Sequence, residues 1–363
     1  MAVVQGQCMF MCPESERNLR EIQHRLHPFE MVKGTENTKR PKADPESTVK
    51  EYSRPAAGKK ALVLSDLRPP EVLYITWSYL VESIANKTDV GYLTVYNFIF
   101  DRLRSIRQDA VIQRSEGPEI VAILEQAVRF LLASSYRLCR EDMMNFDTKI
   151  CFDHLSECLN RLLVFYHFYP DFAKNQVEFQ SLHMLCNLGS SQAVLHILGL
   201  PFHLRNHKRI KLALQLNSAY LENNFVKFTR LSEQCNYIES CILHRYRTSF
   251  LISSLAVMNV AYHSKALTFP SCVLSEWLGF DSTQEASAFC KECGLTIKSD
   301  SVCFIKGSLK PQSKMAHKRT LCHKLVDSKL KKNMSMSDII KGFGYERKER
   351  SEKPMQDMWD YVD

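Results

Sequence analysis

Glycine is scarce in this sequence, with 12 residues in 363, and stretches in which apolar and polar residues alternate are rare. Alternation with a period of two is the pattern of a half-buried strand, so its rarity disfavours a β-rich fold. Hydrophobic residues still make up 45% of the chain, which is enough for a full core. We therefore expect a mainly α-helical protein of one large or two to three small domains.

The common motifs of catalytic and nucleotide-binding sites are also missing. The sequence contains no GxxxxGK[ST], GxGxxG, GxSxG or HExxH. Thirteen cysteines and twelve histidines give many chance pairs, but no local signature marks one cysteine as a nucleophile. We expect neither enzymatic activity nor a cofactor.

A secretory leader and a disulfide framework are not indicated. The first ten residues, MAVVQGQCMF, lack a basic region followed by a sustained apolar one. The uncharged stretch Thr248 to Ser264 is short for a membrane span and carries Ser, Asn and His, so a buried helix fits it better. The cysteines are odd in number and scattered through apolar segments of a large chain. They are typical of buried thiols in a reducing compartment, the cytosol or nucleus.

Two cysteine clusters raise the alternative of a metal site. Cys290 and Cys293 form a CxxC with Cys303 nearby and Cys322-His323 further on, but strong zinc signals pair two closely spaced couples. The spacing favours buried thiols over zinc. Cys8 and Cys12 have no second couple in the arm, so an apolar patch that anchors the arm is the better interpretation; it would comprise Cys8, Met9, Phe10, Met11 and Cys12.

Composition divides the chain into four parts. Residues 1–70 are rich in proline and charge and predict an extended arm, with one short helix possible at residues 46–52. Residues 71–265 carry apolar residues at three- and four-residue spacing and predict an irregular helical-repeat body, TPR- or PCI-like. The helices expected there cover residues 71–87, 97–114, 118–139, 149–169, 173–188, 191–198, 209–222 and 236–262.

One of these helices also carries a run of arginines. Apolar residues share one face of residues 97–114, and we expect Ile106 on that face to be buried. Arg102, Arg104 and Arg107 could contact phosphates, but structural ion pairs such as Asp101 with Arg104 are favoured.

Residues 266–310 show a different order of elements. A short helix with proline near its start is followed by a second helix that begins near Asp281 or Ser282 and ends at Gly294. The segment TIKSDSVCFIKG then predicts two short strands joined by a turn. Two helices followed by a hairpin are the layout of a winged helix.

Positive charge is concentrated behind that domain. Residues 306–332 contain nine Lys or Arg and one acid, a local charge of +8, which equals the formal charge of the whole chain. Such a segment is expected of contact with nucleic acid, although a solvated tail or nuclear-import signal explains it equally well. Residues 311–363 are predicted to be a basic, then polar, tail. The candidate phosphate-binding residues are Lys306, Lys310, Lys314, Lys318 and Arg319.

Several motifs resemble those of the Sac-three/GANP family, the scaffold subunits of the TREX-two mRNA-export complex. The resemblance covers roughly residues 6–305. The matching segments are Met11-Cys12-Pro13, Glu16-Arg17, Phe29-Glu30, Lys50 to Ala56 and Phe100 to Asp109. The resemblance makes the opening cysteine cluster a family arm motif, with no metal implied.

The resemblance implies a non-catalytic scaffold in nuclear mRNA export. Family members pair with a PCI-domain subunit and a small acidic Sem/DSS-type peptide, and the juxtaposed winged helices form a surface that binds RNA or single-stranded nucleic acid. The residues expected to face the partner are Val302, Phe304 and Ile305, and no membrane partner is expected. The family is also linked to centrosome duplication, spindle function and mitotic progression, so a protein-interaction role there is the alternative. The expected location is nucleus and cytoplasm, with centrosome and mitotic spindle under the alternative.

Overall fold

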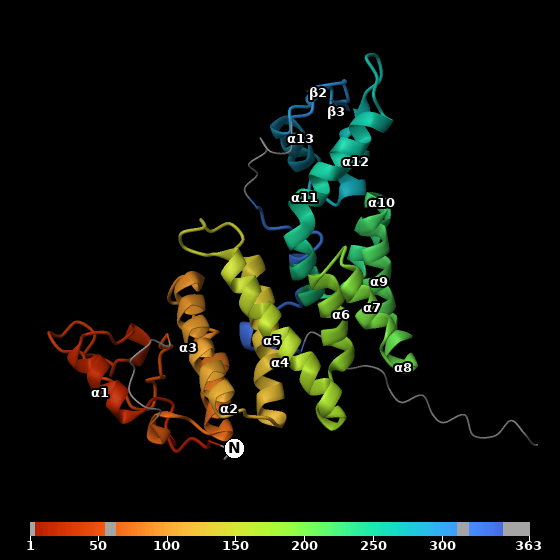
Figure 1. The fold of residues 1–363 in the computed structure, drawn as a ribbon. Coiled ribbons are helices and arrows are strands. Elements are labelled where there is room, and N and C mark those ends of the chain that lie inside the picture. Colours follow the sequence, from red (N-terminus) through yellow and green to blue (C-terminus); the bar gives the residue numbers. More distant parts are fainter. Residues whose placement is uncertain (1–3, 55–62, 311–318, 344–363) are drawn as a thin grey trace, which may run out of the picture.

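The computed structural model describes residues 4–54, 63–310 and 319–343 of the chain, and it is mainly helical (Figure 1). The arm contains one α-helix and two short 3-10 turns; these are α1 (Glu14–Ile22), η1 (Pro28–Glu30) and η2 (Leu64–Asp66). The arm was predicted to be extended, with one short helix possible at residues 46–52; the structure instead places a helix, α1, at Glu14–Ile22. The short helix suggested for residues 46–52 is absent, and that segment is a turn followed by extended chain.

The helical body is a series of packed helices, the first of which starts at a proline. Pro70 occupies the first turn of its helix, where a missing N–H costs no hydrogen bond. The body's first elements are α2 (Pro70–Tyr79), the π-helical turn η3 (Leu80–Ile84), α3 (Tyr92–Ile112), α4 (Pro118–Arg137), α5 (Thr148–Phe168) and η4 (Pro170–Phe172). It continues with α6 (Gln176–Cys186), α7 (Ser191–Leu198), α8 (Phe202–Arg205), α9 (Lys208–Leu221), α10 (Phe225–Glu233) and α11 (Tyr237–Ala261).

The main hydrophobic core lies between these helices and fixes their phase. Ile106 of α3 is fully buried, as predicted, together with the other apolar residues of its face. Helix α4 is buried around most of its circumference because α2, α5 and α11 all pack against it. α11 spans most of the uncharged stretch Thr248 to Ser264, and among the described residues no helix is long and apolar enough to cross a membrane.

A small C-terminal unit has its own core. It contains β1 (Phe269–Pro270), α12 (Ser271–Leu278), α13 (Thr283–Glu292), β2 (Thr296–Lys298) and β3 (Ser301–Cys303). The three strands form an antiparallel sheet in the order β1-β3-β2. Ser282 caps α13 by accepting a hydrogen bond from the Glu285 N–H, and Gly279 ends α12 in a left-handed conformation at φ +65°. The second half of α11 completes this core.

The chain after the C-terminal unit returns to the helical body, where a polar tail was predicted. We call residues 319–343 the strap; it contains η6 (Asp327–Lys329) and α14 (Met336–Lys341). Met336, Ile339 and Ile340 of α14 are buried in the main core against α4 and η3. The prediction of a tail is therefore wrong for the strap. Its lysine-rich composition indicated solvent-exposed chain, but α14 has a short apolar face that packs in the core.

Candidate functional site: a clasped arm and a basic junction

A buried carboxylate, Glu30, joins the arm to α3. It accepts a hydrogen bond from Arg20 of α1 at 2.9 Å and one from Arg102 of α3 at 3.0 Å. Burial alone would raise the pKa of this carboxyl group, but Arg102 and Arg20 together hold it below its ordinary value. The charged pair is therefore maintained inside the protein, where an isolated carboxylate would be costly.

A second buried carboxylate, Asp109, extends this network. It pairs with Lys50 of the arm at 2.7 Å and with Arg68 at 2.8 Å. Arg68 also donates to the Ser105 hydroxyl at 2.9 Å and to the Met11 carbonyl at 3.1 Å. We call the two carboxylates and their cationic partners the clasp; its members are Arg20, Glu30, Lys50, Arg68, Arg102 and Asp109.

The arginine run of α3 mostly forms structural ion pairs, as the sequence favoured. Arg102 belongs to the clasp, and Arg107 pairs with Glu157 of α5 at 2.6 Å. The predicted pair of Asp101 with Arg104 is wrong, because Arg104 instead lies over the ring of Tyr52 at 3.7 Å. Stacking of a guanidinium on an aromatic face replaces the helical pairing.

The cysteines form no metal site within the described part of the chain, and twelve of them are buried. Cys290 and Cys293 belong to the small core, and burial raises the pKa of the Cys290 thiol to about 12. Cys272 is exposed, contrary to the expectation that all are buried. In the arm, Cys8 and Cys12 are buried as expected, but Met9 and Phe10 between them are 69% and 63% exposed. The predicted apolar patch therefore faces inward only in part.

The predicted basic residues fall in different surroundings. Lys306 and Lys310 are exposed beyond β3, where the Lys310 N–H donates to the Cys293 carbonyl. Arg319 is half-buried at the start of the strap. Lys314 and Lys318 lie outside the described residues. Lys306 and Lys310 thus lie beside the C-terminal unit, whereas Arg319 lies at the start of the strap.

Arg319 lies near Arg140, and a third arginine, Arg137, precedes Arg140 by three residues; the sequence gave no reason to select either. Arg140, just beyond the end of α4, and Arg319 both lie close enough to the Cys139 thiol to offset part of the burial that raises its pKa to about 11, while Asp327 acts in the opposite direction. Arg137, the last residue of α4, lies near Cys241 of α11 and over the ring of Tyr92 at 5.2 Å. We call Arg137, Arg140 and Arg319 the arginine cluster. Among the described residues, none of the three forms an ion pair with a carboxylate.

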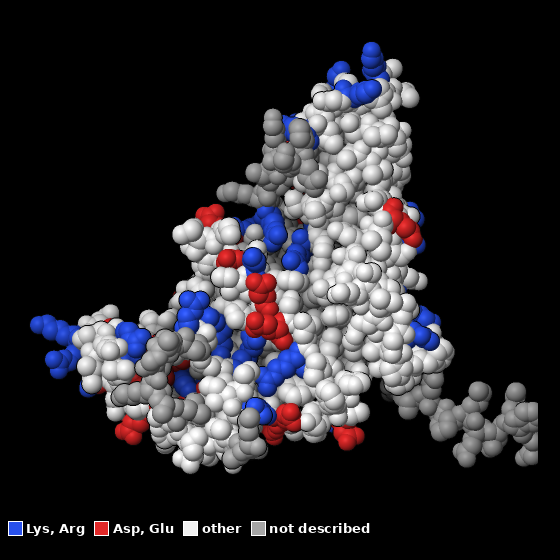
Figure 2. Space-filling view, viewed as in Figure 1, with Lys and Arg blue, Asp and Glu red and all other residues white. Residues whose placement is uncertain are grey.

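Basic side chains also gather on the surface in this part of the molecule, with acidic ones directly below them (Figure 2). In Figure 2, Lys and Arg side chains gather beside α11, above the upper ends of α4 and α5. Several other cations of the body have carboxylate partners or donate to backbone carbonyls, as Arg247 does to Gly279 at 2.9 Å. Within the described part of the chain, the three arginines of the cluster have no carboxylate partner, and Arg137 lies over the ring of Tyr92 at 5.2 Å.

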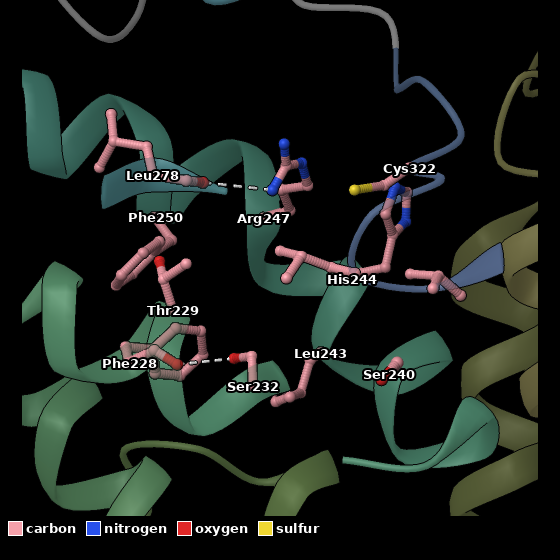
Figure 3. A pocket seen from close by; sticks show the side chains of 12 residues that line it. Phe228, Thr229, Ser232, Ser240, Leu243, His244, Arg247, Phe250, Leu278 and Cys322 are labelled. Carbon is pink, nitrogen blue, oxygen red and sulfur yellow. Dashed lines mark hydrogen bonds between the residues drawn. The ribbon is translucent and has the colours of Figure 1, made fainter. Parts of the chain in front are cut away.

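A small cavity of about 30 Å³ lies behind this surface, between α10, α11, α12 and the strap (Figure 3). The Nε2–H of His244 donates to the Thr320 carbonyl at 2.7 Å, which fixes the strap beside α11. Burial, with the positive charges of Arg247 and Arg319, lowers the pKa of His244 to about 4. The cavity holds at most about one water, so it is a packing gap at the junction and no ligand site.

The predicted partner-binding residues divide between core and surface. Val302 and Phe304 are buried in the small core, whereas Ile305 is 39% exposed. Of these three side chains, only Ile305 has surface with which to meet another protein. A shallow depression of about 330 Å³ lies on the outer face of α13; it is lined by Thr283, Gln284, Ser287, Ala288, Lys291, Ile297 and Asp300.

Comparison with the sequences of known proteins identifies the family of this chain. A sequence model of the SAC3/GANP family matches residues 11–299. The chain is similar to SAC3 family protein 1 of Schizosaccharomyces pombe, at 30% identity over 94% of this chain and 35% of the relative. Protein xmas of Drosophila melanogaster is 31% identical over 81% of this chain and 15% of its own length, and SAC3 family protein B of Arabidopsis thaliana is 26% identical over 90% and 20%. The chain thus spans about a third or less of each relative, and it belongs to the SAC3/GANP family.

Proposed function

We propose that the protein is a non-catalytic scaffold whose C-terminal unit is a winged helix and whose basic junction binds single-stranded RNA. The unit has two helices followed by a hairpin, and the sheet order β1-β3-β2 places the strand before α12 beside the hairpin. In this arrangement α13 is the recognition helix and the β2–β3 hairpin is the wing. The packed helices before it are proposed to be the PCI-like repeat.

The arginine cluster carries the proposal of RNA binding. Three guanidinium groups without carboxylate partners among the described residues lie where α4, α11 and the strap meet. Arginine suits phosphate because its planar group donates two parallel hydrogen bonds, and a patch of such groups binds nucleic acid without reading its sequence. Lys306 and Lys310 on the C-terminal unit would extend the contact along the strand.

The cellular role proposed with this surface is nuclear mRNA export. Within it, the protein would pair with a PCI-type subunit and a small acidic peptide. This proposal is supported by membership of the SAC3/GANP family and by a C-terminal unit that leaves Ile305 and the outer face of α13 exposed.

Binding of a fluorescent single-stranded RNA, measured against salt concentration, tests the surface. The variant Arg137→Gln/Arg140→Gln/Arg319→Gln should weaken binding to all sequences about equally. Each lost phosphate contact should flatten the slope of log affinity against log salt by about 0.7, or about 2 for the three. The matched control removes three exposed cations from the arm, Lys33→Gln/Lys39→Gln/Arg40→Gln, and should leave the slope unchanged.

A second set separates the junction from the predicted basic segment. Replacing Lys306, Lys310, Lys314 and Lys318 by Gln tests that segment alone. If neither this variant nor the triple arginine variant alters affinity or slope, while both melt as the parent does, RNA binding at these surfaces is wrong. The protein-interaction role at centrosome and spindle would then be preferred.

Pairing with a PCI-type subunit is tested at Ile305. The variant Ile305→Glu should reduce co-purification with that subunit at least tenfold without lowering the melting temperature, because the side chain is exposed. Lys298→Glu, on the same hairpin, is the control for a change of charge alone. Unchanged co-purification of Ile305→Glu would remove this surface from the proposed interface.

A further inference from the structure

A loop of the arm carries a second group of exposed cations, at the end of the molecule away from the C-terminal unit (Figure 1). Residues 31–43 form this loop, which is closed at its base by an antiparallel bridge between Met31 and Ala43. The exposed cations on it are Lys33, Lys39, Arg40 and Lys42. Figure 2 shows Lys and Arg side chains that project from the arm at the left edge of the molecule.

Carboxylates neutralise little of this charge. Lys42 pairs with Glu21 of α1 at 2.6 Å, and its hydrogen bond lowers the pKa of that carboxyl group. The other three cations of the loop have no carboxylate partner among the described residues. The one acid in residues 33–42 is Glu36, which accepts a hydrogen bond from the Gly34 N–H at 2.7 Å. Four cations and one acid leave residues 33–42 with a local charge of +3.

The backbone of the same loop is bound at its base and free at its outer end. The Val32 N–H donates to the Lys42 carbonyl at 2.8 Å, and the Lys42 N–H donates to the Thr35 hydroxyl at 3.2 Å. The chain bends at residues 38–40, and within the described part of the protein the peptide groups of residues 39–41 form no hydrogen bond. A partner can therefore straighten residues 39–41 without breaking a backbone hydrogen bond that they make.

The sequence of this outer end is a short basic run interrupted by proline. Residues 38–42 read TKRPK, and we call them the arm tip. Short runs rich in lysine and arginine are typical of nuclear-import signals. RNA would use the positive charge alone, because phosphate contacts do not read the rest of a segment. A protein groove that binds an extended peptide also uses free peptide groups and a backbone that proline has stiffened, so the arm tip suits such a groove better.

We propose that the arm tip is a nuclear-import signal, which binds as an extended peptide in an acidic groove of an import receptor. The assignment rests on the nuclear role proposed above, but it does not depend on RNA binding. Lys39 and Arg40 would supply the charge that the groove recognises, and Lys42 would exchange Glu21 for an acid of the receptor. The clasp holds the arm on α3, so the tip is presented on a fixed base.

Receptor binding by the full chain tests the proposal. The probe is purified importin-α, truncated to its peptide-binding repeats. Lys39→Ala/Arg40→Ala should raise the Kd about tenfold or more, whereas Lys39→Arg/Arg40→Lys keeps both charges and should bind within about twofold of the parent. The matched control Lys331→Ala/Lys332→Ala removes two adjacent exposed lysines of the strap and should leave the Kd unchanged. All of these variants should melt as the parent does, because the side chains are exposed.

Three results of the binding experiment would overturn the assignment. They are no receptor binding by the parent, an unchanged Kd in Lys39→Ala/Arg40→Ala, and an equal loss in the strap control. If the arm variant instead weakens RNA binding while its receptor Kd stays unchanged, the arm tip contacts nucleic acid and the proposal is wrong. Failure of RNA binding at the arginine cluster would leave the receptor Kd as expected, so the two proposals fail separately.

Localisation in cells gives a second readout. The full chain fused to tandem fluorescent proteins, and so too large to enter the nucleus by diffusion, should accumulate there. Lys39→Ala/Arg40→Ala should remain mainly in the cytoplasm, and Lys39→Arg/Arg40→Lys should restore accumulation. Loss of accumulation in Lys331→Ala/Lys332→Ala, with none in the arm variant, would place the signal in the basic segment of residues 306–332 and overturn the proposal.

Discussion

At the scale of single residues, docking of the arm depends on two buried carboxylates, Glu30 and Asp109. Each faces two cations that come from separate parts of the chain. Both residues lie in segments that resemble family motifs, Phe29-Glu30 and Phe100 to Asp109, but helical spacing favoured a pair of Asp101 with Arg104. Local spacing predicts partners within one helix, whereas Lys50 and Asp109 are 59 residues apart and meet only through the fold.

Removing the charge of Asp109 should expose this dependence. Asp109→Asn leaves Lys50 and Arg68 facing a neutral amide, with Arg68 uncompensated in the interior. Breaking a buried ion pair in this way costs about 3–5 kcal/mol of unfolding free energy. Urea denaturation measures this loss, and hydrogen exchange should show reduced protection in the arm. The control Glu157→Gln, at an exposed pair, should cost about 1 kcal/mol or less. Equal effects of the two substitutions would refute the special role of the clasp.

A half-buried histidine, His183, and a buried one, His244, make stability depend on pH. Burial lowers the pKa of His183 and of His244 to about 4, while an unfolded histidine titrates near pH 6.5. The unfolded chain therefore binds more protons between these values, so stability is full above pH 6.5 and falls as the pH drops toward 4. We expect the melting temperature to fall across this window. In His244→Gln, whose amide can still donate to the Thr320 carbonyl, the fall should be smaller. An identical pH dependence in this variant would contradict the assignment.

At the scale of elements, the strap is the feature that the sequence concealed. The helices from α2 to α7 show extended apolar stripes, and the structure places them within a few residues of the predicted ranges. α14 has six residues and follows a run of lysines, so its apolar face is too short to give a periodic signal. Its position is set by tertiary contacts. The Tyr136 hydroxyl both donates to the Cys322 carbonyl and accepts from the Cys322 N–H, and the Asp281 carboxylate accepts the N–H groups of His323 and Lys324.

A core substitution in α14 should loosen the strap selectively. Ile340 is fully buried, so Ile340→Ala should cost about 2–5 kcal/mol through lost burial and the cavity left behind. Hydrogen exchange should rise across residues 319–343 before it rises in α4. Lys341→Ala, next to it but at a surface pair with Glu82, should change stability by about 1 kcal/mol or less. If both variants exchange like the parent, the strap does not contribute to the core as described.

At the scale of the whole molecule, one helix belongs to both cores. Residues of α11 up to Phe250 pack in the main core, and Leu251, Leu255 and Met258 pack in the small one. The boundary predicted after residue 265 follows the change in sequence pattern and falls in the loop after α11. Composition cannot reveal a helix whose two halves serve different cores, because its apolar residues look continuous.

This shared helix predicts that the two parts unfold together. Trp77 is fully buried in the main core, and Trp277 packs against Phe269 in the C-terminal unit, so single-tryptophan variants can report on each part separately. In the parent, the two reporters should give coincident urea transitions. Ser249→Pro, at an exposed position in the middle of α11, removes a helical hydrogen bond at a cost of about 3 kcal/mol.

The proline variant should separate the two transitions, with Trp277 responding at lower urea. Ser249→Ala keeps the helix intact and should leave the transitions coincident. The C-terminal unit is also tied through Asp281 to the strap, so the separation should widen when Asp281→Ala is combined with the proline. Coincident transitions in the combined variant would mean that packing between the parts, rather than the continuous helix and the strap, makes the molecule unfold as one.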